Sequence, residues 1–181
     1  TGRVSPARIA ARPAGATTIP LDLEPYGSRV LVFSKRPPVR GSEGGRVAPL
    51  DISAGWKVTF GEKAAPVVME RLRSWTDEEA TRWYSGTATY EQDVQVAEGF
   101  LQPGLEVRLD FGEGRPIPET PQGTGMQAWL EAPVREAAVV YINDRRAGAV
   151  WCPPYSLAVT GFLRRGENRI RIVVGNLAVN H

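Results

Sequence analysis

The chain has 181 residues, 42% of them hydrophobic and 8% aromatic, which is enough for one globular domain with a hydrophobic core. Its 22 Lys and Arg residues against 20 Asp and Glu residues leave a net charge of +2, and this small surplus argues against nucleic acid as a partner. No apolar run approaches the roughly 18 residues that a bilayer requires, so we expect no membrane segment.

Residues 1–49 predict an arm, a hairpin and a linker. The opening stretch mixes Arg, Ala, Pro and Gly without a helical or strand period, which is typical of an arm. Two apolar runs in residues 20–33, separated by the turn signal at 25–28, predict a tight hairpin. Residues 34–49 are rich in Pro and Gly and predict a linker. We expect the hairpin to pack on the edge of the following domain or to end a preceding one, and the start at Thr1 suggests a piece of a longer polypeptide.

Strand patterns recur at short intervals from residue 50 onward. "LEVRLDF" alternates strictly between apolar and charged residues, and in "NRIRIVV" the isoleucines face one way and the arginines the other. The expected strands are residues 55–60, 84–96, 105–111, 126–132, 137–143, 147–151, 155–160 and 168–174. One short helix is expected over residues 75–83, with Thr76 as its cap. This succession predicts an all-β protein, an antiparallel β-sandwich.

Most catalytic and metal-binding chemistries lack the residues that they need. The only histidine is His181, the last residue, so we expect no nucleophilic Ser-His-Asp or Cys-His system. The single cysteine, Cys152, stands beside Trp151 and predicts a small buried side chain at a strand end. We expect no catalytic residue, no transition-metal ligands and no cofactor. Carboxylates in "TDEE" (76–79) or oxygens of the glycine-rich loops are donors that would suit a structural calcium ion.

Aromatic side chains remain as candidates for a site, because several fall at expected strand ends and turns. Rings in such places either stack on a sugar face or close a corner of the core, and core packing is the commoner role for a single ring. The candidate carbohydrate contacts are Trp75, Asp77, Glu78, Arg82, Trp83, Trp151 and Tyr155. We expect the core role more for Trp83 and Trp151 than for Trp75, and the charged members to reach sugar hydroxyls.

Several motifs resemble known modules of large glycoside hydrolases. The stretch "AVVYINDRRAGAVWCPPYSLAVTGFLRRGENRIRIVVGNL" is similar to the jelly-roll sugar-binding domain of the galactose-binding-like superfamily, as also found in family 2 glycosidases. The order of "PYGSRVLVF", "GWKVTF", "SWTDEEATRWYSGTATY" and the terminal "NLAVNH" resembles the C-terminal portion of bacterial α-L-rhamnosidases of glycoside hydrolase family 106. This resemblance covers roughly residues 20–181 and implies that residues 50–181 form a galactose-binding-domain-like jelly roll.

The resemblance also implies a functional setting. In such enzymes the catalytic carboxylates lie on a separate barrel domain, so the partners implied are carbohydrate and other domains of a larger, periplasmic or secreted bacterial glycoside hydrolase. Three features depart from the family pattern: Asn143-Asp144 replaces Asn-Gly, Ala178 replaces an aromatic residue, and residues 112–125 are an added segment. The three prolines and four glycines of that segment leave open a functional loop and a disordered one.

Three functions remain open from the sequence. The first is a non-catalytic β-sandwich module of a glycoside hydrolase that binds carbohydrate or supports its neighbours. The second is a small self-contained glycosidase that uses two carboxylates. The third is a purely structural or interaction domain without a ligand, in which every aromatic ring belongs to the core.

Overall fold

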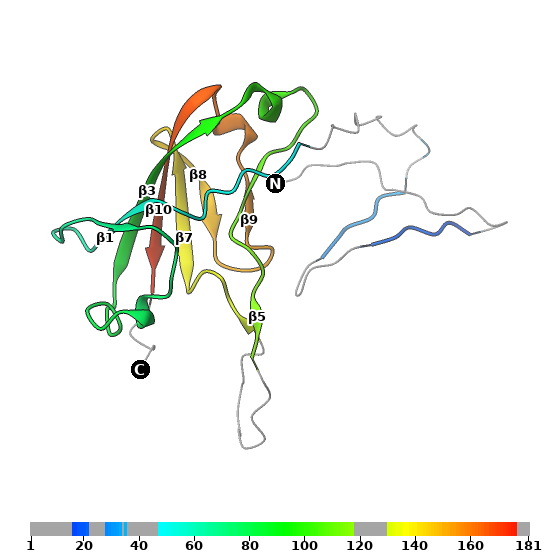
Figure 1. The fold of residues 1–181 in the computed structure, drawn as a ribbon. Coiled ribbons are helices and arrows are strands. Elements are labelled where there is room, and N and C mark those ends of the chain that lie inside the picture. The colour runs from blue at the N-terminus through cyan, green and yellow to red at the C-terminus, as the bar shows by residue number, and fades with distance from the viewer. Residues whose placement is uncertain (1–15, 22–27, 34, 36–46, 118–129, 177–181) are drawn as a thin grey trace, which may run out of the picture.

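The computed structural model describes residues 16–21, 28–33, 35, 47–117 and 130–176 (Figure 1). Within these residues the elements are β1 Trp56–Phe60, β2 Val67–Met69, η1 Trp75–Asp77, β3 Thr87–Val96, η2 Glu98–Leu101, β4 Arg108–Asp110, β5 Arg115–Pro116, β6 Leu130–Glu131, β7 Ala137–Ile142, β8 Arg145–Val150, β9 Ser156–Ala158, η3 Thr160–Phe162 and β10 Gly166–Gly175. The three η elements are single 3-10 turns, and no helix in this part of the chain is long and apolar enough to cross a membrane. The predicted all-β class is confirmed.

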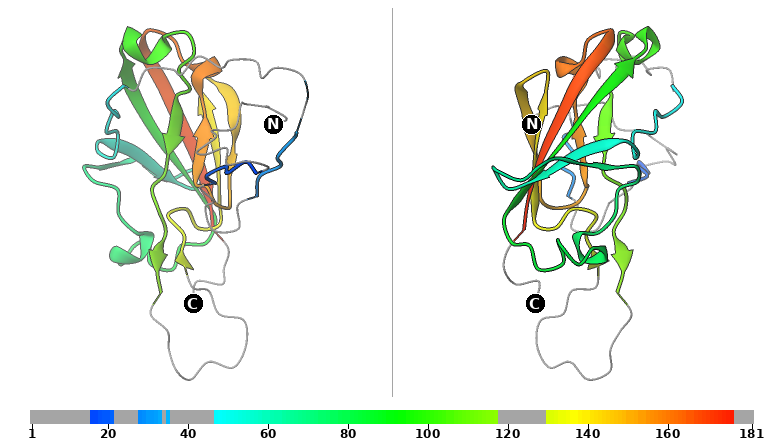
Figure 2. Two further views of the ribbon diagram at one scale, coloured as in Figure 1. Left: turned by 90° about the vertical axis from the view of Figure 1, so that its right-hand side faces the viewer. Right: turned by 60° about the vertical axis from the view of Figure 1, so that its left-hand side comes forward.

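Six strands form one large antiparallel sheet in the order β2-β1-β3-β10-β7-β8. The two longest strands, β3 and β10, lie side by side at its centre and pair from Thr87 with Gly175 to Val96 with Gly166. They are far apart in the sequence, so this pairing joins the middle of the chain to its last strand. Both β3 and β10 cross the full height of the sheet in Figure 2.

A small sheet of β4 and β9 forms a second layer over one face of the large sheet (Figure 2). Apolar side chains on and beside its strands, including Val107, Leu109 and Leu157, pack against the buried core of the large sheet. The layers approach closely at Gly148 of β8, where a Cβ atom would lie 2.7 Å from Leu157 Cδ1. Two layers with a shared core make a β-sandwich, as predicted.

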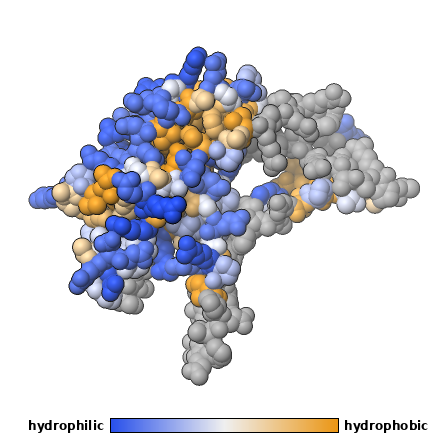
Figure 3. Space-filling model, in the orientation of Figure 1, coloured by the Kyte–Doolittle hydropathy of each residue, from blue (hydrophilic) through white to orange (hydrophobic). Residues whose placement is uncertain are grey.

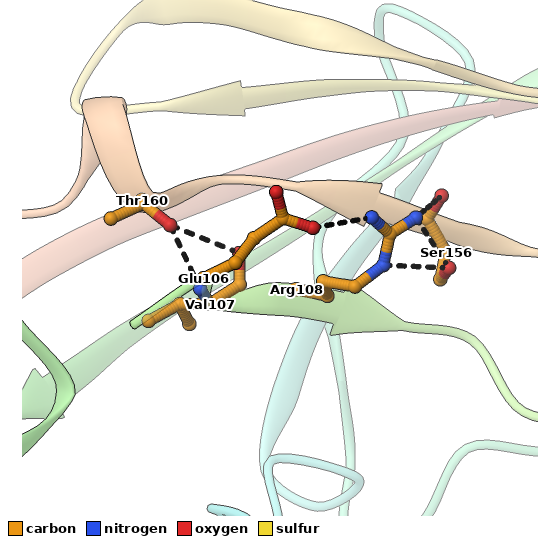
Figure 4. A network of polar contacts seen from close by, with 5 residues as sticks. All are labelled: Glu106, Val107, Arg108, Ser156 and Thr160. Atoms are coloured by element: carbon orange, nitrogen blue, oxygen red, sulfur yellow. Dashed lines mark hydrogen bonds and ion pairs between the residues drawn. The ribbon is translucent and has the colours of Figure 1, made fainter. Parts of the chain in front are cut away.

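Side-chain hydrogen bonds reinforce the small sheet (Figure 4). The backbone N–H of Val107 donates to Thr160 Oγ1 at 2.8 Å, just beyond the end of the β4–β9 ladder. Arg108 donates to Ser156 Oγ at 3.0 Å across the ladder and to Glu106 Oε1 at 2.8 Å. These bonds hold together a pair of three-residue strands that backbone pairing alone would support weakly.

Alternating burial shows which face of each strand meets the core. On β10, Ile170 and Ile172 are buried while Arg169 is exposed and Arg171 half-buried on the opposite face. Strand β7 alternates in the same way, and its Val140 and Ile142 are among the largest fully buried side chains. The sequence predicted this one-sided burial because successive strand residues point to opposite faces.

A two-residue turn at Asn143-Asp144 joins β7 to β8. Both residues have positive φ, 50° and 63°, which is the backbone of a type I′ hairpin turn. The Asn143 side chain ties the turn to β10, because Nδ2 donates to Asn168 Oδ1 at 2.9 Å and Oδ1 accepts from Arg169 N at 3.2 Å. A tight turn therefore forms with aspartate at the position where a glycine was expected.

Other sequence predictions fared unevenly. The strands expected at 55–60, 84–96, 137–143, 147–151, 155–160 and 168–174 are confirmed with boundaries shifted by a few residues, whereas β2 and β5 were missed. The strand expected over 105–111 is shorter, and the one expected over 126–132 lies largely outside the described residues. The same is true of most of the arm, the hairpin turn, the linker and the added loop. The boundary at residue 50 stays a prediction.

The predictions for the helix and for the cysteine were wrong. The helix expected over residues 75–83 is only the single 3-10 turn η1, because "WTDEEATRW" has no apolar stripe that could hold a longer helix against the core. Cys152 is exposed, not buried, because it lies two residues beyond the end of β8, in an exposed bend.

Candidate functional site

The segment of residues 74–86, before β3, carries most of the predicted site residues. Ser74 begins it as the N-cap of η1: its Oγ accepts from Thr76 N at 3.3 Å, and Asp77 Oδ2 accepts from Ser74 N at 3.1 Å. The N-cap is therefore Ser74, and the predicted cap, Thr76, was wrong. This reciprocal capping box uses one oxygen of the Asp77 carboxylate to fix the turn.

Trp75 is a packing residue of the aromatic cluster formed with Phe60, Tyr84 and Tyr90. Its ring makes edge-on contacts with Phe60 and Tyr84, with centroids 5.3 and 5.7 Å apart. Its Nε1–H donates to Tyr90 Oη at 2.5 Å. Burial raises the pKa of the Tyr90 phenol, and the Trp75 hydrogen bond offsets part of that rise. Trp75 thus anchors the segment to the core.

The end of the segment is clamped to the end of β10. Asn176 Nδ2 donates to Tyr84 O at 3.0 Å, and Asn176 Oδ1 accepts from Gly86 N at 2.9 Å. The Tyr84 hydroxyl donates to Thr87 O at 2.8 Å, which folds its ring over Gly86. A Cβ at Gly86 would lie 2.9 Å from Tyr84 Oη and φ there is +148°, so glycine is required by both space and backbone.

Local contacts also engage the charged candidates. Glu78 forms an ion pair with Arg73 at 3.0 Å, and both side chains are more than two-fifths exposed. Arg82 Nε donates to Thr76 O at 3.3 Å, back across the segment. Each keeps further donor or acceptor atoms on an exposed side chain, so both groups are available to hydroxyls of a ligand.

Trp83 and Trp151 are the exposed rings, with 65% and 69% of their surfaces accessible. The expected ranking is therefore reversed: Trp75 packs against the core while these two face solvent. Tyr155 is half-buried and its carbonyl oxygen accepts from Phe111 N at 2.9 Å. A sequence pattern does not distinguish these cases, because ring burial depends on what packs from other segments.

The strand register places the two exposed tryptophans at one end of the large sheet. Strand β3 begins at this end, where Ala88 pairs with Val174, and β8 finishes there, where Val150 pairs with Ala138. Trp83 precedes β3 and Trp151 follows β8, with β10 and β7 lying between those two strands. We call this the aromatic end. It brings the predicted residues to one side of the fold, and ligand contact by them stays a prediction.

The opposite end of the large sheet, where β10 begins, holds an open polar depression of about 750 Å³ that sequence reasoning missed. It is lined by Gly55, Lys57, Glu91, Gln92, Asp93, Asn143, Asp144, Arg164, Glu167 and Arg169. Arg169 donates to Glu91 Oε1 at 2.6 Å, and this hydrogen bond is the main reason that the pKa of the Arg169 guanidinium is raised. Alternating charges on the outer faces of β3 and β10 are the signal that could have predicted it.

Metal binding has no geometric support in the described part of the chain, where no three His, Cys, Asp or Glu side chains come together as possible ligands. The Asp77 and Glu78 carboxylates of "TDEE" contact Ser74 and Arg73. The expectation of a structural calcium ion stays a prediction.

Comparison with known proteins associates this fold with glycoside hydrolases. The rhamnosidase of Novosphingobium sp. PP1Y matches with a TM-score of 0.61 and 25% identity over 81% of this chain and 12% of its own. A protein of Formosa agariphila that carries the name of a β-glucuronidase is 27% identical over 137 residues, which are 73% of this chain and 10% of that protein. The Ruminococcus gnavus β-glucuronidase shares the fold, with a TM-score of 0.50 and 16% identity over 69% of this chain and 20% of its own.

These proteins are much longer than the chain, which spans 12% of the Novosphingobium rhamnosidase and 10% of the Formosa protein. No family model matches the sequence. The coarse part of the resemblance is therefore supported: this is a β-sandwich of the kind that forms a small part of glycoside hydrolases. The more specific resemblance, to the C-terminal portion of family 106 α-L-rhamnosidases, stays a prediction.

Proposed function

We propose that the chain is a non-catalytic accessory module of a larger α-L-rhamnosidase-like glycoside hydrolase, with a galactose-binding-like jelly roll that contacts carbohydrate at its aromatic end. The observation that carries the proposal is the similarity to the Novosphingobium rhamnosidase, which extends over most of this chain but only 12% of that enzyme. A module of this size is a part that supports a site or adds binding surface to one built on other domains.

The aromatic end supplies the surface for carbohydrate. Exposed indole rings such as those of Trp83 and Trp151 present flat apolar faces on which the C–H face of a sugar packs. Asp77, Glu78 and Arg82 lie within six residues of Trp83 in the chain and offer hydrogen-bonding groups for hydroxyls. Trp75 and Tyr84 pack against each other and help to hold the segment in place.

Titration of the chain with L-rhamnose, D-galactose and D-glucuronic acid, followed by NMR or calorimetry, tests the binding. We expect Trp83→Ala and Trp151→Ala each to weaken saccharide binding by about tenfold, equivalent to about 1.4 kcal/mol, with the unfolding midpoint preserved. Val67→Ala, a truncation of another exposed apolar side chain, serves as the matched control and should change neither quantity. Unchanged affinity in both tryptophan variants would remove the aromatic end from the proposal.

The alternatives give different results in the same preparation. A purely structural domain would bind none of these sugars at any concentration. A self-contained glycosidase would release nitrophenol from an aryl rhamnoside or glucuronide, and one carboxylate substitution would abolish the release. We expect no turnover by the isolated chain, because the proposal assigns the reacting groups to another domain.

A further inference from the structure

The segment of residues 28–33 exposes an apolar run that this fold leaves uncovered. Val30, Leu31, Val32 and Phe33 expose 89%, 40%, 73% and 81% of their surfaces. In Figure 1 this lighter blue segment lies away from the sandwich, and hydrophobic side chains show at the same place in Figure 3. Four consecutive apolar residues exposed to this degree are unusual on a folded surface and mark an interaction site.

The sequence of the run indicates what kind of partner covers it. In an extended chain Val30 and Val32 point to one side and Leu31 and Phe33 to the other, so both sides are apolar. A strand with one side in water would carry polar residues on that side. The run therefore matches a strand that is buried on both faces, which requires a neighbouring sheet edge for its backbone and apolar layers above and below.

The sandwich itself does not supply these layers. Its buried core and the partly buried residues packed against it begin at Ile52 and include no residue of the 28–33 segment. Among the described residues, no backbone hydrogen bond joins 28–33 to a residue of the sandwich. The sandwich completes its core without the run.

We propose that residues 28–33 form a strand inside a second β domain of the same polypeptide and thereby join that domain to the sandwich. The length of the similar proteins favours this occupant, because the chain accounts for only 12% of the rhamnosidase and 10% of the Formosa protein. The inference goes beyond the proposed function and shares only its premise of a larger protein. It does not depend on saccharide binding, so the two can fail separately.

Hydrogen exchange tests the proposal on two proteins, the present chain and a longer polypeptide that also contains the second β domain. We expect the amides of residues 30–33 to exchange rapidly in the present chain and about 100-fold more slowly in the longer protein. Amides of residues 170–174, in the central strand β10, serve as the internal control and should be protected equally in both. Equal exchange of residues 30–33 in the two proteins would overturn the proposal.

A charge substitution provides the second readout. Val32→Asp should leave the unfolding midpoint of the present chain unchanged, and in the longer protein it should lower the midpoint of the added domain. The matched control is Val68→Asp on the edge strand β2, where the valine is 59% exposed, and it should leave that added domain unaffected. Protection of residues 30–33 that rises with the concentration of the present chain and disappears in Val32→Asp would instead identify a second copy as the occupant.

Discussion

The two ends of the large sheet are fixed by different interactions. At the aromatic end, where β3 begins, the rings of Phe60, Trp75 and Tyr84 pack edge to face. At the other end, where β10 begins, the fully buried amide of Asn168 binds the backbone of residues 164–166. We call the second region the amide end.

The difference predicts how each end responds to damage. Contacts between rings are many and individually weak, so neighbouring side chains recover part of a loss by shifting. Hydrogen bonds of a buried amide are directional, and removing the amide leaves its backbone partners without alternatives. The amide end should therefore be the less tolerant of the two, although it carries none of the predicted ligand contacts.

The largest effect is expected for Asn168→Ala. The Asn168 side chain accepts from Arg164 N and donates to the carbonyl oxygens of Arg164 and Gly166, at 2.7 to 2.9 Å. Leaving these groups buried and unpaired should lower the free energy of unfolding by about 4 kcal/mol, measured in urea. Gln95→Ala removes an exposed amide from the neighbouring strand and is the control. A loss below about 1 kcal/mol in Asn168→Ala would contradict the comparison.

A smaller loss is expected for Trp75→Ala at the aromatic end. Removing a half-buried ring that packs on Phe60 and Tyr84 should cost about 3 kcal/mol. Trp83→Ala, in the same segment but largely exposed, should cost less than about 0.5 kcal/mol. Thermal unfolding of the two variants side by side measures the difference. Equal losses of stability in the two variants would mean that Trp75 contributes no more to the fold than the exposed Trp83.

Tyr90→Phe tests the polar contact within the aromatic cluster and adds a pH dependence. Removing the hydroxyl leaves Trp75 Nε1–H without its acceptor and should cost about 1 to 2 kcal/mol. Because burial raises the pKa of Tyr90 above 10.0 in the folded state, its contribution is present below that pH and is lost as the pH rises through the folded pKa. Urea unfolding on both sides of this range should show a steeper alkaline loss in the wild type than in Tyr90→Phe. Parallel pH profiles would argue against Tyr90 as the source of the alkaline loss of stability.

The smallest effect is expected for Arg169→Gln in the polar depression. Its ion pair with Glu91 is solvent-exposed on the arginine side, so water and salt screen the attraction. We expect a slight loss of stability in dilute buffer that disappears in concentrated salt. A large loss that persists in salt would show that the depression is as tightly organised as the buried Asn168 site.

The fold was largely predictable from local patterns. Strands such as β7 and β10 were predicted from the sequence and show an alternating burial pattern, because the period of two is a property of the extended backbone itself. The same principle fails for β2, whose three residues are too few to show a period, and for residues 75–83, where acidic residues suggested a helix that no apolar stripe holds.

The sequence by itself determined the longer strands, the core-facing side of each and the tight turn at Asn143-Asp144, since all three depend on neighbours along the chain. Only the tertiary structure decided that Trp75 is covered while Trp83 and Trp151 are exposed. Burial of a ring depends on the segments that pack against it from other parts of the chain. Phe60, Tyr84 and Tyr90 contact Trp75 from three other places in the sequence, and the residues next to Trp75 do not predict these contacts.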